Sequence, residues 1–207
     1  MELISKIKKY GLRGVSRILL KKILLIEIIK FHYLKTIINP KVLAKELQDF
    51  DLDVKELEYS DFLLGDKSVF YGKKLEVIER RFNDTTYKGY GIIENGILVY
   101  STWISLEKLG LPFKSDYKLT NTEGYFEDSH CHINARGRKF HSKMNYYCLA
   151  KLFELGKTEG ICIVIDGNFP AIKTQMKSGA RDLGCFYAGK IFTIPFVTLN
   201  KKKYDYR

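Results

Sequence analysis

A chain of 207 residues is long enough for one domain with a substantial core. Its 45% hydrophobic and 29% charged residues are typical of a globular protein and exclude wholesale disorder. An apolar run starts at Ile18, but Lys21, Lys22 and Glu27 interrupt it. These charges exclude a secretory signal and a conventional transmembrane helix, so we expect a cytoplasmic protein.

The N-terminal quarter carries most of the positive charge. Residues 1–48 hold eleven Lys or Arg against three Glu, which is +8 of the net +11. We interpret residues 1–49 as a basic, apolar helical arm, with a long helix over 14–38 that Asn39-Pro40 ends and a short helix over 41–49. Three uses of the arm remain open: packing on the domain, loose contact with the inner membrane surface, and a homodimer interface. Its charge suits an acidic partner such as anionic lipid or an acidic carrier protein, whereas nucleic acid is disfavoured because no reader motif is present.

Residues 50–207 alternate between β-rich and helix-patterned segments. The dipeptide Asn95-Gly96 separates two β-rich runs and predicts a hairpin, because both turn positions need positive φ. Gly, Pro, Lys and Ser over 108–122 indicate a loop. The expected strands are 53–59, 87–94, 97–104, 125–134, 161–165, 185–194 and 196–199, and the expected helices are 71–82, 139–155 and 170–178. This order predicts an α+β fold with a mixed, mostly antiparallel central sheet flanked by helices.

Four cysteines, at 131, 148, 162 and 185, form no Cys-x-x-Cys pair and have no zinc-ligand spacing. We interpret them as free thiols in a reducing compartment and expect no metal. A zinc site made from His130, His132 and His141 is a weaker alternative, because no further ligands accompany them.

Two segments carry the chemical signal. The first runs from Cys131 to Ser142 and passes from a strand through Arg136-Gly137-Arg138 into a helix. The second starts at Asn168, directly after a buried strand, and continues as a helix to Gly179. Helix N-termini have amides without intrahelical partners and favour negative charge, so both segments suit a phosphorylated ligand.

The order of elements over 52–199, together with these two segments, resembles the GNAT-type (Gcn5-related) N-acetyltransferases. The resemblance implies that acetyl-CoA or another acyl-CoA is the donor and that its pyrophosphate lies on the strand-to-helix turn. The residues implied to bind it are Arg136, Gly137, Arg138, Lys139, Phe140, His141, Ser142 and Asn168. The glycines of the family motif fall on Lys139 and His141, and the tyrosine that often protonates the departing thiolate falls on Gln175. Tyr187 or water is the expected substitute acid.

An attacking amine must also lose a proton, and the expected base lies in the strand at 125–134. We favour Asp128 with His130, since a carboxylate beside an imidazole can hold it in the basic tautomer. Strand alternation predicts Asp128, His130 and His132 on one face, and Glu127 with Cys131 on the other. Solvent-facing strand residues without a catalytic role are the competing interpretation.

The function implied is acyl-CoA-dependent N-acyl transfer, with acetyl as the first choice of acyl group. The acceptor amine of a small molecule or amino sugar would attack the thioester directly, without a covalent enzyme intermediate. A second hypothesis is a domain that has lost catalysis and serves as a binding module at a membrane surface or on an acidic partner, because two motif glycines and the tyrosine are replaced.

Overall fold

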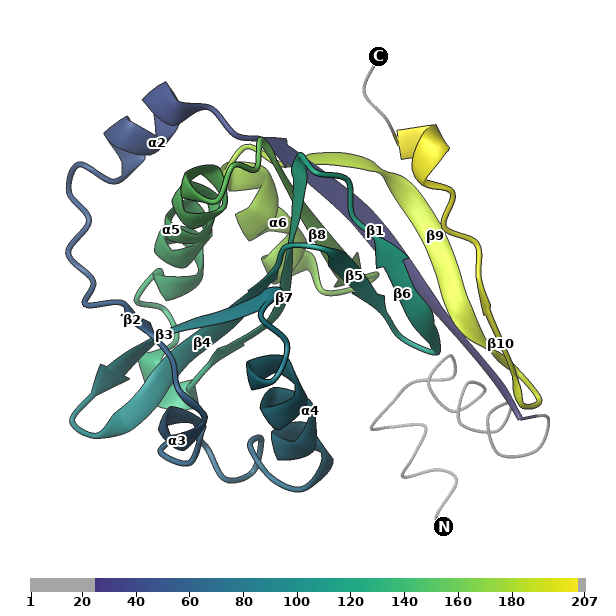
Figure 1. Cartoon of the computed structure of the whole chain (residues 1–207), viewed down its shortest axis with the longest axis horizontal. Coiled ribbons are helices and arrows are strands. Elements are labelled where there is room, and N and C mark those ends of the chain that lie inside the picture. Colours follow the sequence, from purple (N-terminus) through teal and green to yellow (C-terminus); the bar gives the residue numbers. More distant parts are fainter. Residues whose placement is uncertain (1–24, 205–207) are drawn as a thin grey trace, which may run out of the picture.

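The structure is a computed structural model that describes residues 25–204. Its centre is an eight-stranded, twisted sheet in the order β10-β9-β1-β8-β7-β4-β3-β2, and a two-stranded β5-β6 ribbon stands beside it (Figure 1). The strands are β1 (Ile26–Ile37), β2 (Lys55–Glu56), β3 (Tyr87–Glu94), β4 (Ile97–Ser105), β5 (Lys108–Leu111), β6 (Lys114–Lys118), β7 (Glu123–Cys131), β8 (Glu159–Ile165), β9 (Arg181–Ile191) and β10 (Ile194–Val197).

Helices cover both faces of this sheet. The helices are α2 (Pro40–Glu46), α3 (Tyr59–Phe62), α4 (Lys73–Phe82), α5 (Phe140–Glu154) and α6 (Phe169–Lys177), with short 3-10 turns at Ile133–Ala135 and Lys201–Tyr204. Helices α2, α5 and α6 pack on one face, and α3 and α4 pack on the other together with the ribbon (Figure 1). Consecutive residues of β4 show the two layers, because Trp103 packs under α4 whereas Ile104 packs under α5. The predicted α+β fold with a mostly antiparallel sheet is confirmed.

Strand β1 corrects the prediction of a helix over residues 14–38. Residues 26–37 are extended and lie between β8 and β9, antiparallel to both. A strand with neighbours on both edges and cover on both faces is apolar throughout, so its pattern resembles that of a buried helix. Tyr33 and Leu34 are both buried although they point to opposite faces. The sheet therefore includes residues from the segment assigned to the arm, and residues 1–24 of that arm lie outside the described residues.

The β-hairpin at Asn95-Gly96 is confirmed, with φ of 50° and 74° at the two turn positions. The loop predicted over 108–122 is wrong for most of its length, since β5 and β6 occupy it. Leu109 and Leu111 alternate into the core and fix the ribbon against the sheet. Phe113, at the turn between the two strands, has a φ of 76°.

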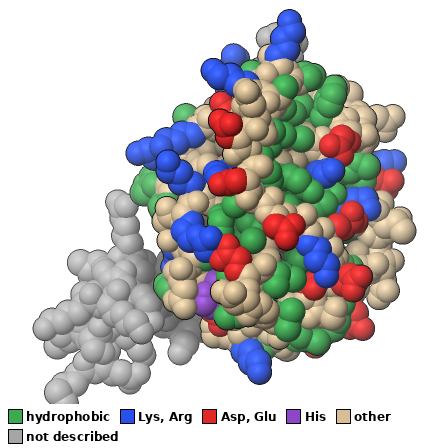
Figure 2. Space-filling model, turned by 90° about the vertical axis from the view of Figure 1, so that its left-hand side faces the viewer, with side chains coloured by type: hydrophobic (Ala, Val, Ile, Leu, Met, Phe, Trp, Pro, Cys, Tyr) green, Lys and Arg blue, Asp and Glu red, His purple; other side chains and the backbone are tan. Residues whose placement is uncertain are grey.

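Charged side chains of both signs are interspersed over the face that carries α2 and the β3-β4 hairpin (Figure 2). Ion pairs connect several of them across elements, such as Lys88 with Glu56 at 3.0 Å. The net positive charge of the sequence is therefore not concentrated on this face. None of the helices over residues 25–204 is long and apolar enough to cross a bilayer.

Candidate active site

Strands β7 and β8 are the parallel pair of the sheet, and they pair only from Glu123–Glu159 to Phe126–Cys162. Beyond Phe126 they part, and a cavity of about 330 Å³ opens between them. We call it the parted-strand cavity. Its lining includes Glu127, Asp128 and Ser129 of β7, Val164 of β8 and Gln175 of α6. Backbone groups of two parted strands lose their ladder partners, so this opening offers hydrogen bonds to an inserted ligand.

A second, larger cavity of about 710 Å³ lies where the N-termini of α5 and α6 meet. We call it the helix-end cavity. Arg136, Gly137, Lys139, His141 and Ser142 line it from the β7-α5 turn, and Asn168 lines it from the start of α6. Two helix N-termini that face one space favour an anion there, and Arg136 and Lys139 add positive charge. Both cavities share Ser129, His141 and Asn168, so they adjoin, and we call the two together the channel.

Lys139 occupies a glycine position of the resembled motif and also adopts a glycine-like conformation. Its φ is 62° and ψ is 16°, in the left-handed region, where it forms the N-cap of α5. Gly137, two residues earlier, has a φ of 84°. The backbone of the turn thus has a conformation that glycine adopts readily. For Lys139, the left-handed conformation costs about 1–2 kcal/mol of conformational free energy. A residue held in this region marks a conformation that the surrounding structure enforces.

Arg138 does not line the helix-end cavity, contrary to the expectation for this residue. Its guanidinium donates to both carboxylate oxygens of Glu94, at 2.5 and 2.6 Å, and it lies over the Phe140 ring at 4.4 Å. The bidentate bond lowers the pKa of Glu94, so the pair stays ionised at neutral pH. Phe140 itself is buried in the core at the start of α5 and also lines the helix-end cavity. Arg138 therefore ties the turn to the β3-β4 hairpin.

Two buried polar pairs fix the walls of the channel. His141 shares a hydrogen bond of 2.7 Å with the Tyr100 hydroxyl, and burial lowers the pKa of His141, so its imidazole is neutral. Gln175, at the position of the family tyrosine, donates its amide to Asn145 at 3.2 Å and is buried. An amide cannot protonate a thiolate, and Gln175 therefore serves only as a polar wall of the parted-strand cavity.

A β-bulge at Asp128 changes the predicted alternation of side chains. Asp128 has a φ of 58°, and the pairing of β7 with β4 shifts at Thr102, so the residues after the bulge change face. Glu127 and Asp128 consequently both reach α4, and the ring of His130 packs edge-on against Phe70 on the same side. The prediction that Glu127 lies opposite Asp128 and His130 is wrong.

Arg81 of α4 binds both carboxylates. Its guanidinium lies 2.7 Å from Glu127 and 2.7 Å from Asp128, and it covers the Trp103 ring at 5.2 Å. Lys74 forms a short hydrogen bond to the other oxygen of Asp128. Both oxygens of Asp128 thus contact cations, and the expected bond between Asp128 and His130 is not formed in the described part of the chain. Asp128 acts here as an anchor for α4.

His130 and Tyr187 occupy different surroundings. Burial lowers the pKa of His130, so its ring is neutral, and its Nε2 is buried without a hydrogen-bond partner among the described residues. It lines the helix-end cavity. Tyr187, by contrast, lies on β9 and lines a separate space beside Lys30 and Asp166, because β1 separates β9 from β8. The structure therefore does not bring Tyr187 to the channel.

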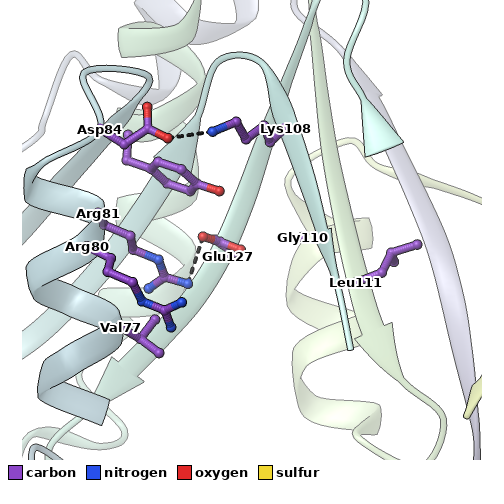
Figure 3. A pocket seen from close by; sticks show the side chains of 9 residues that line it. Val77, Arg80, Arg81, Asp84, Lys108, Gly110, Leu111 and Glu127 are labelled. Atoms are coloured by element: carbon purple, nitrogen blue, oxygen red, sulfur yellow. Dashed lines mark hydrogen bonds and ion pairs between the residues drawn. The ribbon is translucent and has the colours of Figure 1, made fainter. Parts of the chain in front are cut away.

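A third cavity, of about 410 Å³, lies on the opposite side of β7 (Figure 3). We call it the α4-β5 cavity, because Arg80 and Arg81 of α4 face Lys108 and Gly110 of β5 across it. Glu127 lines this cavity and also the parted-strand cavity. The helix-end and parted-strand cavities thus share lining residues, and Glu127 is common to the parted-strand and α4-β5 cavities. Sequence reasoning missed Arg80, Arg81 and Lys108, since nothing in their spacing shows that they meet β7.

Solved structures with a similar architecture include GNAT-type acetyltransferases. A protein assigned to that family from Novosphingobium aromaticivorans superposes with a TM-score of 0.53 at 10% identity, over 79% of this chain and 64% of the other. An acetyltransferase from Colwellia psychrerythraea gives 0.55 at 10% identity, over 79% and 56%. The glucosamine N-acetyltransferase region of a fungal multidomain β-N-acetylglucosaminidase gives 0.55 at 13%, over 86% and 22%.

The chain has the GNAT fold. It spans less than two thirds of the length of each of these three proteins. No family model and no curated protein sequence matches it. Over residues 25–204, no group of three or more His, Cys, Asp or Glu side chains is arranged to hold a metal ion.

Proposed function

We propose that this protein is an acyl-CoA-dependent N-acyltransferase, with acetyl-CoA as its first-choice donor. The observation that carries the proposal is the line of three cavities that meet around β7. The donor pyrophosphate would lie on the amides at the start of α5, near Arg136 and Lys139. Its pantetheine arm would continue into the parted-strand cavity and bring the thioester toward Glu127.

In this arrangement the acceptor amine enters from the α4-β5 cavity and its nitrogen attacks the thioester carbonyl carbon. The carbonyl oxygen becomes an oxyanion, which backbone amides of the unpaired stretch of β7 would stabilise. The carbon–sulfur bond then breaks, and CoA leaves as a thiolate. A thiolate is a tolerable leaving group near neutral pH, so Gln175 in place of a tyrosine does not prevent the reaction.

Glu127 is the best-placed candidate to take the amine proton. It lies between the two cavities, and its side chain is 10% exposed, whereas Asp128 is held by two cations. Arg81 fixes the orientation of the Glu127 carboxylate and covers one of its oxygens. His130 is the second candidate, because its ring is neutral and its buried Nε2 has no hydrogen-bond partner among the described residues, although the ring packs on the α4 side against Phe70.

The direct test is the release of free CoA thiol from acetyl-CoA in the presence of a panel of small primary amines, with an amine-free reaction as the control. We expect release that depends on the amine and yields an N-acetylated product by mass spectrometry. Binding of acetyl-CoA without transfer to any amine would instead support the binding-module hypothesis.

A further inference from the structure

The charges of the α4-β5 cavity specify a chemical class of acceptor. Two of its cations are already neutralised. Arg81 is held between Glu127 and Asp128, and Lys108 lies 2.6 Å from Asp84. Arg80 is different, since it lines the same cavity and has no carboxylate partner in the described part of the chain. Figure 3 shows its side chain extending from α4 on the same side as that of Arg81, toward β7.

The anionic side chains of this cavity already pair with cations of the protein. Asp84 accepts from Lys108 and also from the hydroxyl and backbone amide of Thr86. These bonds, with that of Lys108 the strongest, lower its pKa to about 2, so it remains a fully engaged carboxylate at neutral pH. Glu127 is the other carboxylate, and the proposed function reserves it for the amine. A polycationic acceptor would therefore meet Arg80 without compensation.

The wall opposite Arg80 is anchored in the core and lies close to Glu127. Leu109 and Leu111 anchor β5 in the core, and a Cβ placed on Gly110 would stand 3.0 Å from Glu127 Oε2. The missing side chain at Gly110 thus leaves space beside the carboxylate. At about 410 Å³, the cavity suits a small molecule.

We propose that the acceptor is a small amine that also carries an anionic group, which Arg80 binds while Glu127 receives the amine. A guanidinium binds carboxylate and phosphate oxygens in the same forked geometry, so either group satisfies the proposal. The inference rests on the proposed function for its chemistry, but the anion site itself can be tested without acyl transfer.

The test uses two pairs of acceptors that differ in the anionic group: alanine against alaninamide, and glucosamine 6-phosphate against glucosamine. Binding of all four to the protein is measured by ligand-observed NMR without acyl-CoA, and turnover is measured with acetyl-CoA. We expect the anionic member of at least one pair to bind more tightly and to have the lower KM. The pair that shows the difference identifies the anionic group that Arg80 binds: a carboxylate for the alanine pair, or a phosphate for the glucosamine pair.

Arg80→Ala should raise the dissociation constant and the KM of that anionic acceptor about tenfold and leave its uncharged partner unchanged. Lys73→Ala is the matched control, since Lys73 is an exposed cation of the same helix that does not line the cavity. Equal binding within both pairs, or equal losses in the two variants, would overturn the inference. If acetyl-CoA does not bind, the proposed function fails, whereas the NMR comparison still decides whether Arg80 is an anion site.

Discussion

The cavities on the two sides of β7 differ in what forms their walls: mainly backbone groups on one side and side-chain ion pairs on the other. On the α5-α6 side, backbone shapes the two adjoining cavities: two helix N-termini and a turn with left-handed residues at the helix-end cavity, and parted strands at the parted-strand cavity. On the α4 side, the α4-β5 cavity is formed by side-chain ion pairs that connect Arg81, Lys108, Asp84 and Glu127. A backbone site can recognise a constant group such as a pyrophosphate. A side-chain site can be changed residue by residue, which suits the variable partner of a reaction.

The largest effect on activity is expected from a substitution of Glu127, which lines cavities on both sides of β7. Glu127→Gln keeps the shape of the side chain but removes the proton acceptor, so kcat should fall about 10²- to 10⁴-fold. Affinity for acetyl-CoA should stay unchanged, because the donor binds through the other side. Steady-state kinetics and calorimetry on the same preparation give both numbers.

Tyr187→Phe is the control for this prediction, since Tyr187 lies on β9 away from the channel. It should retain full activity. If Glu127→Gln is fully active and an equivalent change at His130 is not, the base would be His130 and the role given to Glu127 would be wrong.

A smaller effect is expected at the turn of the helix-end cavity. Lys139→Ala and Lys139→Gly both remove the charge and should weaken acetyl-CoA binding several-fold. They should differ in stability, because glycine relieves the left-handed φ of 62° and alanine does not. We expect the glycine variant to be about 1 kcal/mol more stable in urea unfolding. Equal stabilities would mean that the turn does not enforce this conformation.

The smallest effect is expected on stability, from the Lys108–Asp84 ion pair in the wall of the α4-β5 cavity. Asp84 has a pKa of about 2, below its ordinary value, mainly because Lys108 donates to it. The pair therefore stabilises the fold above about pH 4, and this contribution is lost as the pH falls from about 4 to 2. Asp84 is partly exposed, so the gain is about 1 kcal/mol or less.

Asp84→Asn should consequently be less stable than the parent protein at pH 6 and equal to it near pH 2, as measured by urea unfolding at each pH. A stability difference that does not change over this range would show that the Lys108–Asp84 pair does not hold the wall.

The same contrast explains what could be predicted from the sequence. Local signals are sufficient for the Asn95-Gly96 hairpin, for α5 and for α6. The contacts between elements that are distant in the sequence cannot be predicted from local patterns. The pattern of residues 26–37 is compatible with a helix because a strand buried on both faces has no period-2 pattern, although their β-branched and aromatic residues favour a strand.

The candidate base shows the limit most clearly. The run that contains Glu127 and Asp128 was identified from the sequence, but its geometry was not, because a non-glycine bulge has no local signal. The contact of Arg81 with both carboxylates depends on how α4 packs over β7. The position of the Arg138 side chain likewise depends on a residue that is distant in the sequence, because its guanidinium binds Glu94 instead of entering the helix-end cavity.

Calorimetric titration of the protein with acetyl-CoA, repeated with Arg136→Ala and Glu127→Gln, tests whether the channel binds an acyl-CoA donor. We expect micromolar binding to the parent protein, clearly weaker binding to the Arg136 variant, and unchanged binding to the Glu127 variant. Absence of both heat and thermal shift at millimolar acetyl-CoA would contradict the assignment of the channel to an acyl-CoA donor.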